Sequence, residues 1–193
     1  MNCSDVHYRA VVIGASAGGL AALGAILSDL KSTFCMPILL AQHICPHVES
    51  HLTAYFEGKT ALTVKEAEDK DPIQRGTVYI APPNYHLMVE FDGCTALSID
   101  APVNYSRPSI DVLFESAADY FGEALIGIVL SGANSDGAAG LKRIKERGGM
   151  AVVQSVETAE AQAMPQAAIE AADVDHILPL QAIAHFLNTI CEC

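Results

Sequence analysis

The stretch Val11-Val12-Ile13-Gly14-Ala15-Ser16-Ala17-Gly18-Gly19-Leu20-Ala21-Ala22-Leu23 decides how the rest of the chain is interpreted. An apolar run, typical of a buried strand, ends in a serine between small residues, and a helix-forming segment follows at once. Small neighbours let the backbone turn sharply and leave the Ser16 hydroxyl exposed at the carboxyl end of the strand. Gly14-Ala15-Ser16-Ala17-Gly18 fits the G-x-S-x-G pattern of a nucleophile elbow, and the N–H groups that begin the helix suit an oxyanion.

Two other interpretations of this stretch stay open on the motif alone. A dinucleotide- or phosphate-binding loop prefers glycine where Ser16 stands, together with an acidic residue about 20 positions further on. Asp29 comes too early for that role, and the next apolar strand ends in Gln42-His43. The remaining interpretation is an ordinary strand-to-helix turn whose serine has no function.

Length and composition predict one cytoplasmic domain over residues 1–193. The 193 residues are 51% hydrophobic, which is enough to bury a full core. The net charge of −12 argues against a nucleic-acid partner, which requires a basic surface. No apolar run is long enough to span a bilayer, and residues 1–7 lack the basic-then-apolar pattern of a signal peptide. We therefore expect no membrane insertion.

Strand and helix patterns alternate along most of the chain, which predicts a doubly wound α/β fold with a mostly parallel sheet and helices on both faces. Strands are expected at 9–14, 36–42, 124–130, 150–154 and 177–178, and helices at 18–30, 47–58, 108–120, 138–147, 165–172 and 180–190. Residues 62–67, 77–81, 86–91 and 95–99 are shorter strand candidates separated by turn signals. We expect antiparallel pairing among these four, including a hairpin around Asp92-Gly93.

Ser16, His43 and Asp136 each follow a predicted buried strand within a few residues. The carboxyl edge of one parallel sheet can bring three such residues together, and open α/β sheets place their sites there. A serine, a histidine and a carboxylate have the roles needed for acyl transfer: nucleophile, general base, and the group that holds the imidazole's tautomer. Taken singly, each also has a structural interpretation, since Asp136 can simply cap the helix that follows it.

Two other chemistries, a metal site and a cysteine nucleophile, compete with this triad. His43, His47 and His51 recur at every fourth position, the spacing of two zinc ligands on a helix. The strand that ends near His43 interrupts such a helix, and the glutamate of an H-E-x-x-H motif is absent. Cys45 is a further candidate nucleophile, but no elbow surrounds it. We expect neither a metal nor a cofactor.

Several blocks in order along the chain resemble the catalytic domain of the CheB protein-glutamate methylesterases of chemotaxis. They are 14–19, Gln42-His43, 76–83 with His86, 107–114, 130–141, Gln154 and 164–168. The resemblance implies a mostly parallel sheet with an antiparallel hairpin. It also implies hydrolysis of glutamate γ-methyl esters, and deamidation of some glutamines, on the cytoplasmic helices of chemoreceptors. Ser16 matches the family's nucleophile, His43 its base and Asp136 its third triad member.

The chain departs from the family pattern at a few positions. The family usually has threonine at Ala17, Thr-Gly-Met at Ser131-Gly132-Ala133, and glycine at Ala163. These changes leave room for a catalytically silent module that binds receptor helices or a signalling partner. The family's phosphoacceptor domain typically precedes the catalytic part, whereas the first predicted strand begins here at residue 9. We therefore expect an ungated site, with a separate regulator in trans as the remaining route of control.

Overall fold

A computed structural model describes residues 8–44 and 51–191. Its main sheet has seven strands: β1 (Ala10–Ala15), β2 (Ile38–Gln42), β3 (Thr63–Glu66), β4 (Thr77–Ile80), β7 (Leu125–Val129), β8 (Met150–Gln154) and β9 (His176–Leu178). All neighbours pair in parallel in the order β3-β4-β2-β1-β7-β8-β9. The predicted doubly wound α/β fold is confirmed.

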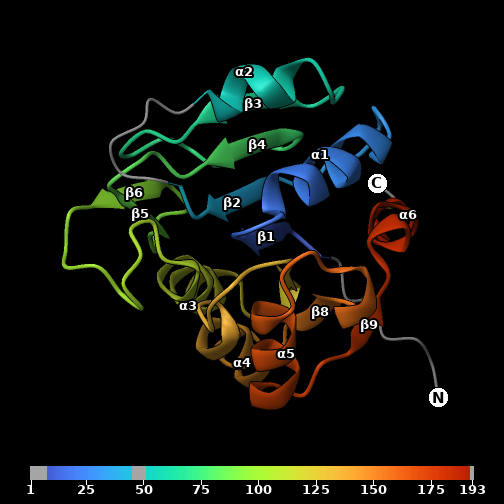
Figure 1. The fold of residues 1–193 in the computed structure, drawn as a ribbon. Coiled ribbons are helices and arrows are strands. Elements are labelled where there is room, and N and C mark those ends of the chain that lie inside the picture. Colours follow the sequence, from blue (N-terminus) through green and yellow to red (C-terminus); the bar gives the residue numbers. More distant parts are fainter. Residues whose placement is uncertain (1–7, 45–50, 192–193) are drawn as a thin grey trace.

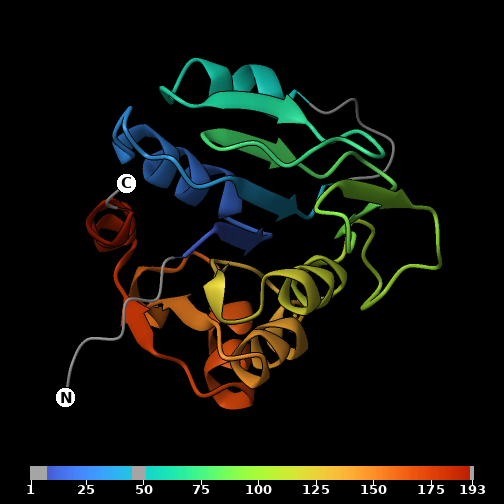
Figure 2. The same ribbon diagram turned by 180° about the vertical axis from the view of Figure 1, so that it is seen from behind.

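Helices cover both faces of this sheet (Figures 1 and 2). They are α1 (Gly19–Asp29), α2 (Leu52–Glu57), α3 (Ile110–Phe121), α4 (Ala138–Glu146), α5 (Ala163–Ala171) and α6 (Leu180–Ile190), with short 3-10 turns at Gly122–Ala124 and Val156–Thr158. Helices α1 and α6 pack together on one face, and α3, α4 and α5 pack side by side on the other. The expected helix over 47–58 is present from Leu52, and its first residues lie outside the described part of the chain.

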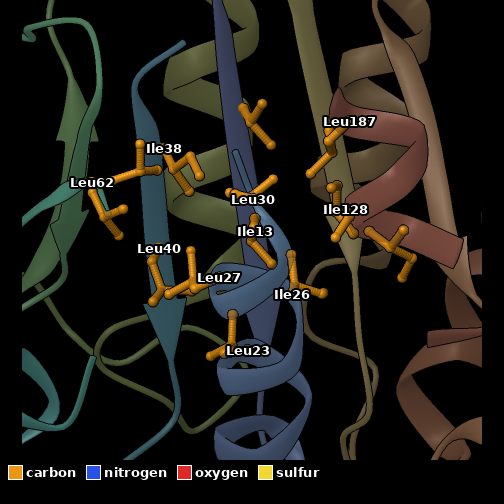
Figure 3. Close-up of a cluster of buried hydrophobic side chains, with 14 of the residues drawn as sticks. Ile13, Leu23, Ile26, Leu27, Leu30, Ile38, Leu40, Leu62, Ile128 and Leu187 are labelled. Atoms are coloured by element: carbon orange, nitrogen blue, oxygen red, sulfur yellow. The ribbon is translucent and has the colours of Figure 1, made fainter. Parts of the chain in front are cut away.

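The two faces of the sheet have separate apolar cores because side chains alternate along each strand. In β1, Val11 and Ile13 point into the core beneath α1 and α6, whereas Ala10 and Val12 point into the core beneath α3 to α5. Figure 3 shows the first of these cores. Strands buried on both faces appear in the sequence as continuous apolar runs, and this is why their prediction succeeds.

The middle of the chain differs from the prediction in one respect. Only β5 (His86–Val89) and β6 (Thr95–Ser98) form an antiparallel pair; β3 and β4 pair in parallel and extend the main sheet. Parallel neighbours usually need a helical crossover of about a dozen residues or more. Here residues 67–76 make the return without a helix, and Pro72 bridges to Cys94 at the hairpin. The hairpin lies beyond the carboxyl ends of β2 and β4 (Figures 1 and 2).

The order in which strands are added to the sheet reverses at β1, and this switch point places the candidate site. Strand β1 has β2 on one side and β7, far later in the sequence, on the other. Loops that leave such a switch point diverge and open a crevice at the carboxyl edge of the sheet. In the described residues, none of the helices has the length and apolar character needed to span a membrane.

Candidate functional site

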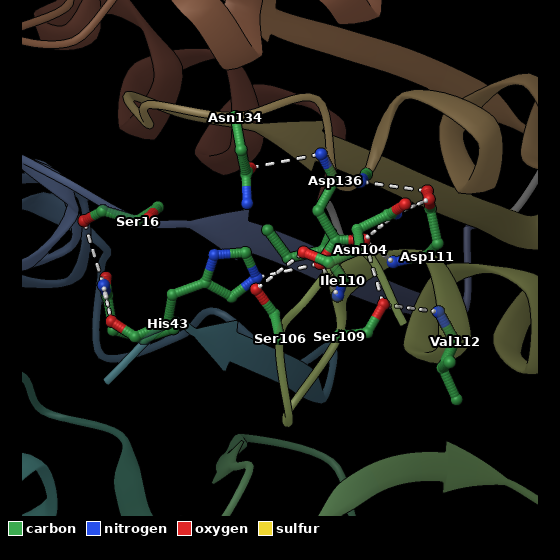
Figure 4. A network of polar contacts seen from close by, with 12 residues as sticks. Ser16, His43, Asn104, Ser106, Ser109, Ile110, Asp111, Val112, Asn134 and Asp136 are labelled. Atoms are coloured by element: carbon green, nitrogen blue, oxygen red, sulfur yellow. Dashed lines mark hydrogen bonds and ion pairs between the residues drawn. The ribbon is translucent and has the colours of Figure 1, made fainter. Parts of the chain in front are cut away.

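Ser16 and His43 lie next to each other because the sheet register puts them there. Ala15 pairs with Gln42, so the two residues follow paired positions on neighbouring strands, and the His43 N–H donates to the Ala15 carbonyl at 3.0 Å. The buried Gln42 side chain reinforces this arrangement. Its Nε2 donates to the Ser16 carbonyl and to the His43 carbonyl, both at 2.9 Å (Figure 4).

The turn that carries Ser16 is fixed by a backbone hydrogen bond and by two glycines. The Ser16 N–H donates to the Ser131 carbonyl at 3.0 Å, which ties the turn to the end of β7. Gly18 has a φ of 75°, a left-handed conformation that favours glycine. A Cβ at Gly19 would lie 2.4 Å from the Gln42 Oε1 and 2.7 Å from the Ala15 Cβ, so only glycine fits there. Ala17 is exposed, and among the described residues its N–H has no acceptor.

His43 contacts Asp136 directly. Its Nε2 lies 2.8 Å from Asp136 Oδ2 (Figure 4), and Asp136 is only 1% exposed. An ionised carboxylate can only accept, so Nε2 carries the proton of this bond and Nδ1 is left unprotonated when the ring is neutral. Figure 4 shows the Nδ1 side of the ring facing the region where Ser16 and Asn134 lie.

The Asp136 carboxylate accepts hydrogen bonds from four further donors. The Ile110 and Asp111 N–H groups, at 2.7 and 3.2 Å, belong to the first turn of α3. The Ser109 hydroxyl and the Asn104 amide each donate to Oδ1 at 2.9 Å. Burial alone opposes ionisation of this group, but the bonds from His43, Asn104 and the Ile110 N–H outweigh it and lower its pKa to about 2. Asp136 is therefore an anion at neutral pH.

The structure changes the interpretation of Asp136 as a cap. The N-cap of α4 is Gly137, with a φ of 92°, and the Asp136 side chain turns away from that helix. It lies instead at the N-terminus of α3, where free N–H groups and the helix dipole favour an anion. Sequence separation concealed this, because Asp136 comes 25 positions after Asp111, the nearest of these donors in sequence.

A second buried carboxylate, Asp111, lies beside the first. Its Oδ1 accepts from the N–H groups of Gly137 and Gly140 at 2.9 and 2.7 Å, and its Oδ2 accepts from Asn104 at 2.8 Å. Burial raises the pKa of Asp111 to about 6 against the opposing bond from Gly140, and the neighbouring Asp136 charge adds to the rise. In the sequence, Asp111 resembles an ordinary acidic residue in the first turn of a helix.

Asn104, Ser109, Gln42 and Asn134 complete the site, and sequence reasoning assigned none of them a role. The Asp136 N–H donates to Asn134 Oδ1 at 3.2 Å, and the Asn134 amide nitrogen points toward the space between Ser16 and the His43 ring (Figure 4). Each contact joins residues that are distant in sequence or depends on a loop conformation. The one local signal was that asparagine favours turns and left-handed backbone, as at Asn104.

A shallow pocket of about 90 Å³ opens beside the imidazole, lined by His43, Ile44, Tyr105, Ser106, Arg107 and Pro108. The Tyr105 ring stands fully in solvent at its rim. It is carried by a two-residue turn in which Val103 and Ser106 exchange backbone hydrogen bonds at 3.2 and 2.9 Å. Asn104 and Tyr105 both have positive φ, 50° and 61°, as in the hairpin turn of type I′.

The alternative chemistries find less support in this geometry. Nε2 of His43 is engaged with Asp136, while His47 and Cys45 lie outside the described residues. Over residues 8–44 and 51–191, no three His, Cys, Asp or Glu side chains are grouped to hold a metal ion. Glu160 lies against Gly18 at the start of α1, with its Oε2 3.0 Å from where a Gly18 Cβ would stand. That carboxylate disfavours a phosphate at this helix N-terminus.

Comparison with known proteins agrees with this architecture. Residues 11–187 match the family model for the CheB methylesterase. A relative from Leptospira interrogans is 51% identical over 179 residues, which is 93% of each chain. Protein-glutamate methylesterase/protein-glutamine glutaminase 1 of Carboxydothermus hydrogenoformans is 43% identical over 90% of this chain, which spans only 53% of that relative.

A solved structure shares the fold. The crystal structure of the Thermotoga maritima CheB methylesterase catalytic domain superposes with a TM-score of 0.90 at 33% identity, covering 96% of this chain and 100% of that one. The family model spans residues 11–187, which include the strands and loops that form the site described above. The chain therefore belongs to the CheB methylesterase family.

Proposed function

We propose that this protein is a protein-glutamate methylesterase that works through an acyl-enzyme on Ser16. The Ser16 oxygen attacks the γ-carbonyl carbon of a methylated glutamate while its proton passes to His43 Nδ1. The protonated His43 then gives that proton to the departing methoxide, and methanol leaves. Water, activated in the same way by His43, hydrolyses the acyl-enzyme and restores Ser16. Asp136 holds the imidazole and stabilises its positive charge in both steps.

The observation that carries this proposal is the 2.8 Å contact between His43 Nε2 and an ionised, buried Asp136. It selects the tautomer in which Nδ1 is free to accept a proton, and the sheet register sets His43 beside the serine. For the oxyanion we propose the N–H of Ala17, which has no acceptor in the part of the chain that the structure describes, joined by the Asn134 amide, which faces the same space (Figure 4). The family membership and the names of the relatives supply the ester substrate.

We propose the cytoplasmic helices of a chemoreceptor as the macromolecular partner, with glutamine deamidation as a second reaction at the same site. Exposed apolar side chains near the rim of the pocket beside His43 support a partner that has an apolar stripe. Tyr105, Val103 and Ile99, exposed by 104%, 38% and 72%, lie along the segment that leads from the hairpin to α3. A helix that carries glutamates between apolar positions presents both an ester for the pocket and a surface for these side chains.

Methanol release from methylated receptor, together with labelling by a fluorophosphonate, tests the proposal. Wild type should release methanol and gain the probe's mass on Ser16, whereas Ser16→Ala should do neither and keep its fold. Asn134→Ala should lower kcat about 10²-fold with little change in KM, as for removal of one oxyanion donor. Ser28→Ala, which removes an exposed hydroxyl on α1, is the matched control and should behave as wild type. A silent binding module is instead indicated if wild type neither labels nor releases methanol.

A further inference from the structure

The feature that the proposed reaction leaves unexplained is the amide of Asn104. Its Nδ2 lies 2.9 Å from Asp136 Oδ1 and 2.8 Å from Asp111 Oδ2. The nitrogen has two hydrogens, and one is directed at each carboxylate. Both acceptors are anionic oxygens, so the nitrogen, and not the amide oxygen, must face them. One neutral group therefore donates to two neighbouring buried carboxylates.

The backbone of Asn104 is held in a conformation that makes this contact possible. Asn104 and Tyr105 are consecutive non-glycine residues at positive φ, 50° and 61°. Such conformations are uncommon, although asparagine tolerates them better than most residues. The turn is closed by the paired backbone bonds between Val103 and Ser106. This turn lies at the surface and places the short Asn104 side chain against the Asp136 carboxylate, which contacts His43.

Among the described donors to Asp136, Asn104 is the one that comes from an exposed segment. The remaining donors to Asp136 are the imidazole of His43 and groups of residues 109–111, all buried except for the partly buried His43. Asn104 itself is an exposed residue on a surface turn. Substitutions there leave both apolar cores intact, so an effect on the reaction can be separated from an effect on folding.

We propose that Asn104 is a positioning residue that keeps the Asp136 carboxylate ionised and oriented toward His43 by donating to it and to the neighbouring Asp111 carboxylate. The inference rests on the proposed function, since it assigns to Asn104 a role in that reaction. It acts through Asp136 and His43 and does not require contact with the substrate. Its loss should therefore lower kcat and leave KM for the methylated receptor nearly unchanged.

Two substitutions at this position separate a hydrogen-bond role from a space-filling one. Asn104→Gly removes the amide without strain, because glycine adopts positive φ freely. Asn104→Asp preserves the shape but replaces a donor with a third carboxylate facing Asp136 and Asp111. A positioning role predicts that kcat falls about 10-fold in Asn104→Gly, the scale of one lost bond to a charged group. It predicts a larger loss, about 10²-fold, in Asn104→Asp. A purely steric role predicts the opposite order.

Asn188 provides the matched control. Its carboxamide also makes two hydrogen bonds at 2.9 Å, to the Lys31 N–H and the Asp29 carbonyl, but at the far contact between α6 and α1. Asn188→Ala should lower the melting temperature without changing kcat at temperatures where the variant is folded. All variants are compared by circular dichroism and by methanol release at several receptor concentrations.

Different results would contradict the positioning role of Asn104 and the proposed methylesterase function. If Asn104→Asp is as active as wild type, or more active than Asn104→Gly, the positioning role is wrong. It is also wrong if KM rises while kcat stays constant. If Ser16→Ala keeps full activity, the proposed function fails whatever the Asn104 variants do. An inactive Ser16→Ala together with the order wild type, Asn104→Gly, Asn104→Asp supports both.

Discussion

The two faces of the sheet are held by different physical interactions. Beneath α1 and α6, the buried contacts come from hydrocarbon side chains such as Leu23, Leu27 and Leu187, each 0% exposed. The face covered by α3 has an apolar core as well, but its end near the site contains Ser109, Asp111 and Asp136, all at least 94% buried. Buried carboxylates are costly unless they are paired and hydrogen-bonded. The comparison therefore predicts that changes on the first face affect stability, and that changes at this end of the second affect the reaction.

The strongest test of that separation is Asp136→Asn. The amide leaves His43 without an anionic partner and favours the wrong tautomer, so kcat should fall about 10⁴-fold, equivalent to about 5.5 kcal/mol of barrier. Methanol release measures the loss, and circular dichroism shows whether the fold is retained. A variant within tenfold of wild type would remove Asp136 from the proposed mechanism.

Leu27→Ala examines the apolar face. Leu27 lies on α1 with its side chain fully buried in the core of this face, and its truncation should lower the free energy of unfolding by about 3 kcal/mol through lost burial and a residual cavity. Urea denaturation measures this loss. At a temperature where the variant is folded, kcat should match that of wild type. A large fall in kcat with unchanged stability would mean that the two faces are not separate in function.

The smallest expected effect is a pH dependence of stability that originates at Asp111. Burial raises its pKa from 3.8 to about 6, so between these values the folded protein holds a proton that the unfolded chain releases. The free energy of unfolding should therefore decrease as pH rises from about 4 to about 6, by on the order of 1 to 2 kcal/mol. Asp136, with its lowered pKa, contributes in the opposite sense, losing stability as pH falls from about 4 toward 2.

Urea denaturation of wild type and Asp111→Asn at pH 4, 5, 6 and 7 isolates the contribution of Asp111. The decrease between pH 4 and 6 should be smaller in the variant. Asp29→Asn, an exposed change at the end of α1 on the apolar face, should leave the wild-type profile unchanged. Identical profiles for wild type and Asp111→Asn would show that this carboxyl group is ionised normally in the folded protein.

The sequence predicts the central part of the fold well, for a physical reason. Strands β1, β2, β7 and β8 are buried on both faces and appear as unbroken apolar runs. Strand β3 lies at the sheet edge, and Val64 is the one buried residue among its four. Such a short, mostly exposed strand lacks the continuous apolar run that marks a strand buried in a parallel sheet, so the parallel partner of β3 was not predictable from its own residues.

The residues of the candidate site also divide into those that the sequence indicates and those that it does not. Ser16, His43 and Asp136 could be proposed from the sequence because each follows an apolar strand within a few residues, and strand ends at one sheet edge converge. Asn104 and Asp111 gave no such signal. Their importance depends on the α3 N-terminus meeting the turn after β7, a contact between segments that sequence periodicity does not relate. The catalytic roles of all these residues stay predictions for the experiments above.

The register of β1 against its two neighbours has a consequence for hydrogen exchange and inactivation. Strand β1 pairs over its length with β2 and β7, and all its residues are buried. Amides in such central strands exchange only through openings close to global unfolding, whereas edge strands and surface turns open locally. The spacing of Ser16 and His43 is set by these slowly exchanging strands. Heat or urea should therefore remove activity and secondary structure in a single coincident transition, with β1 and β2 amides protected until that point.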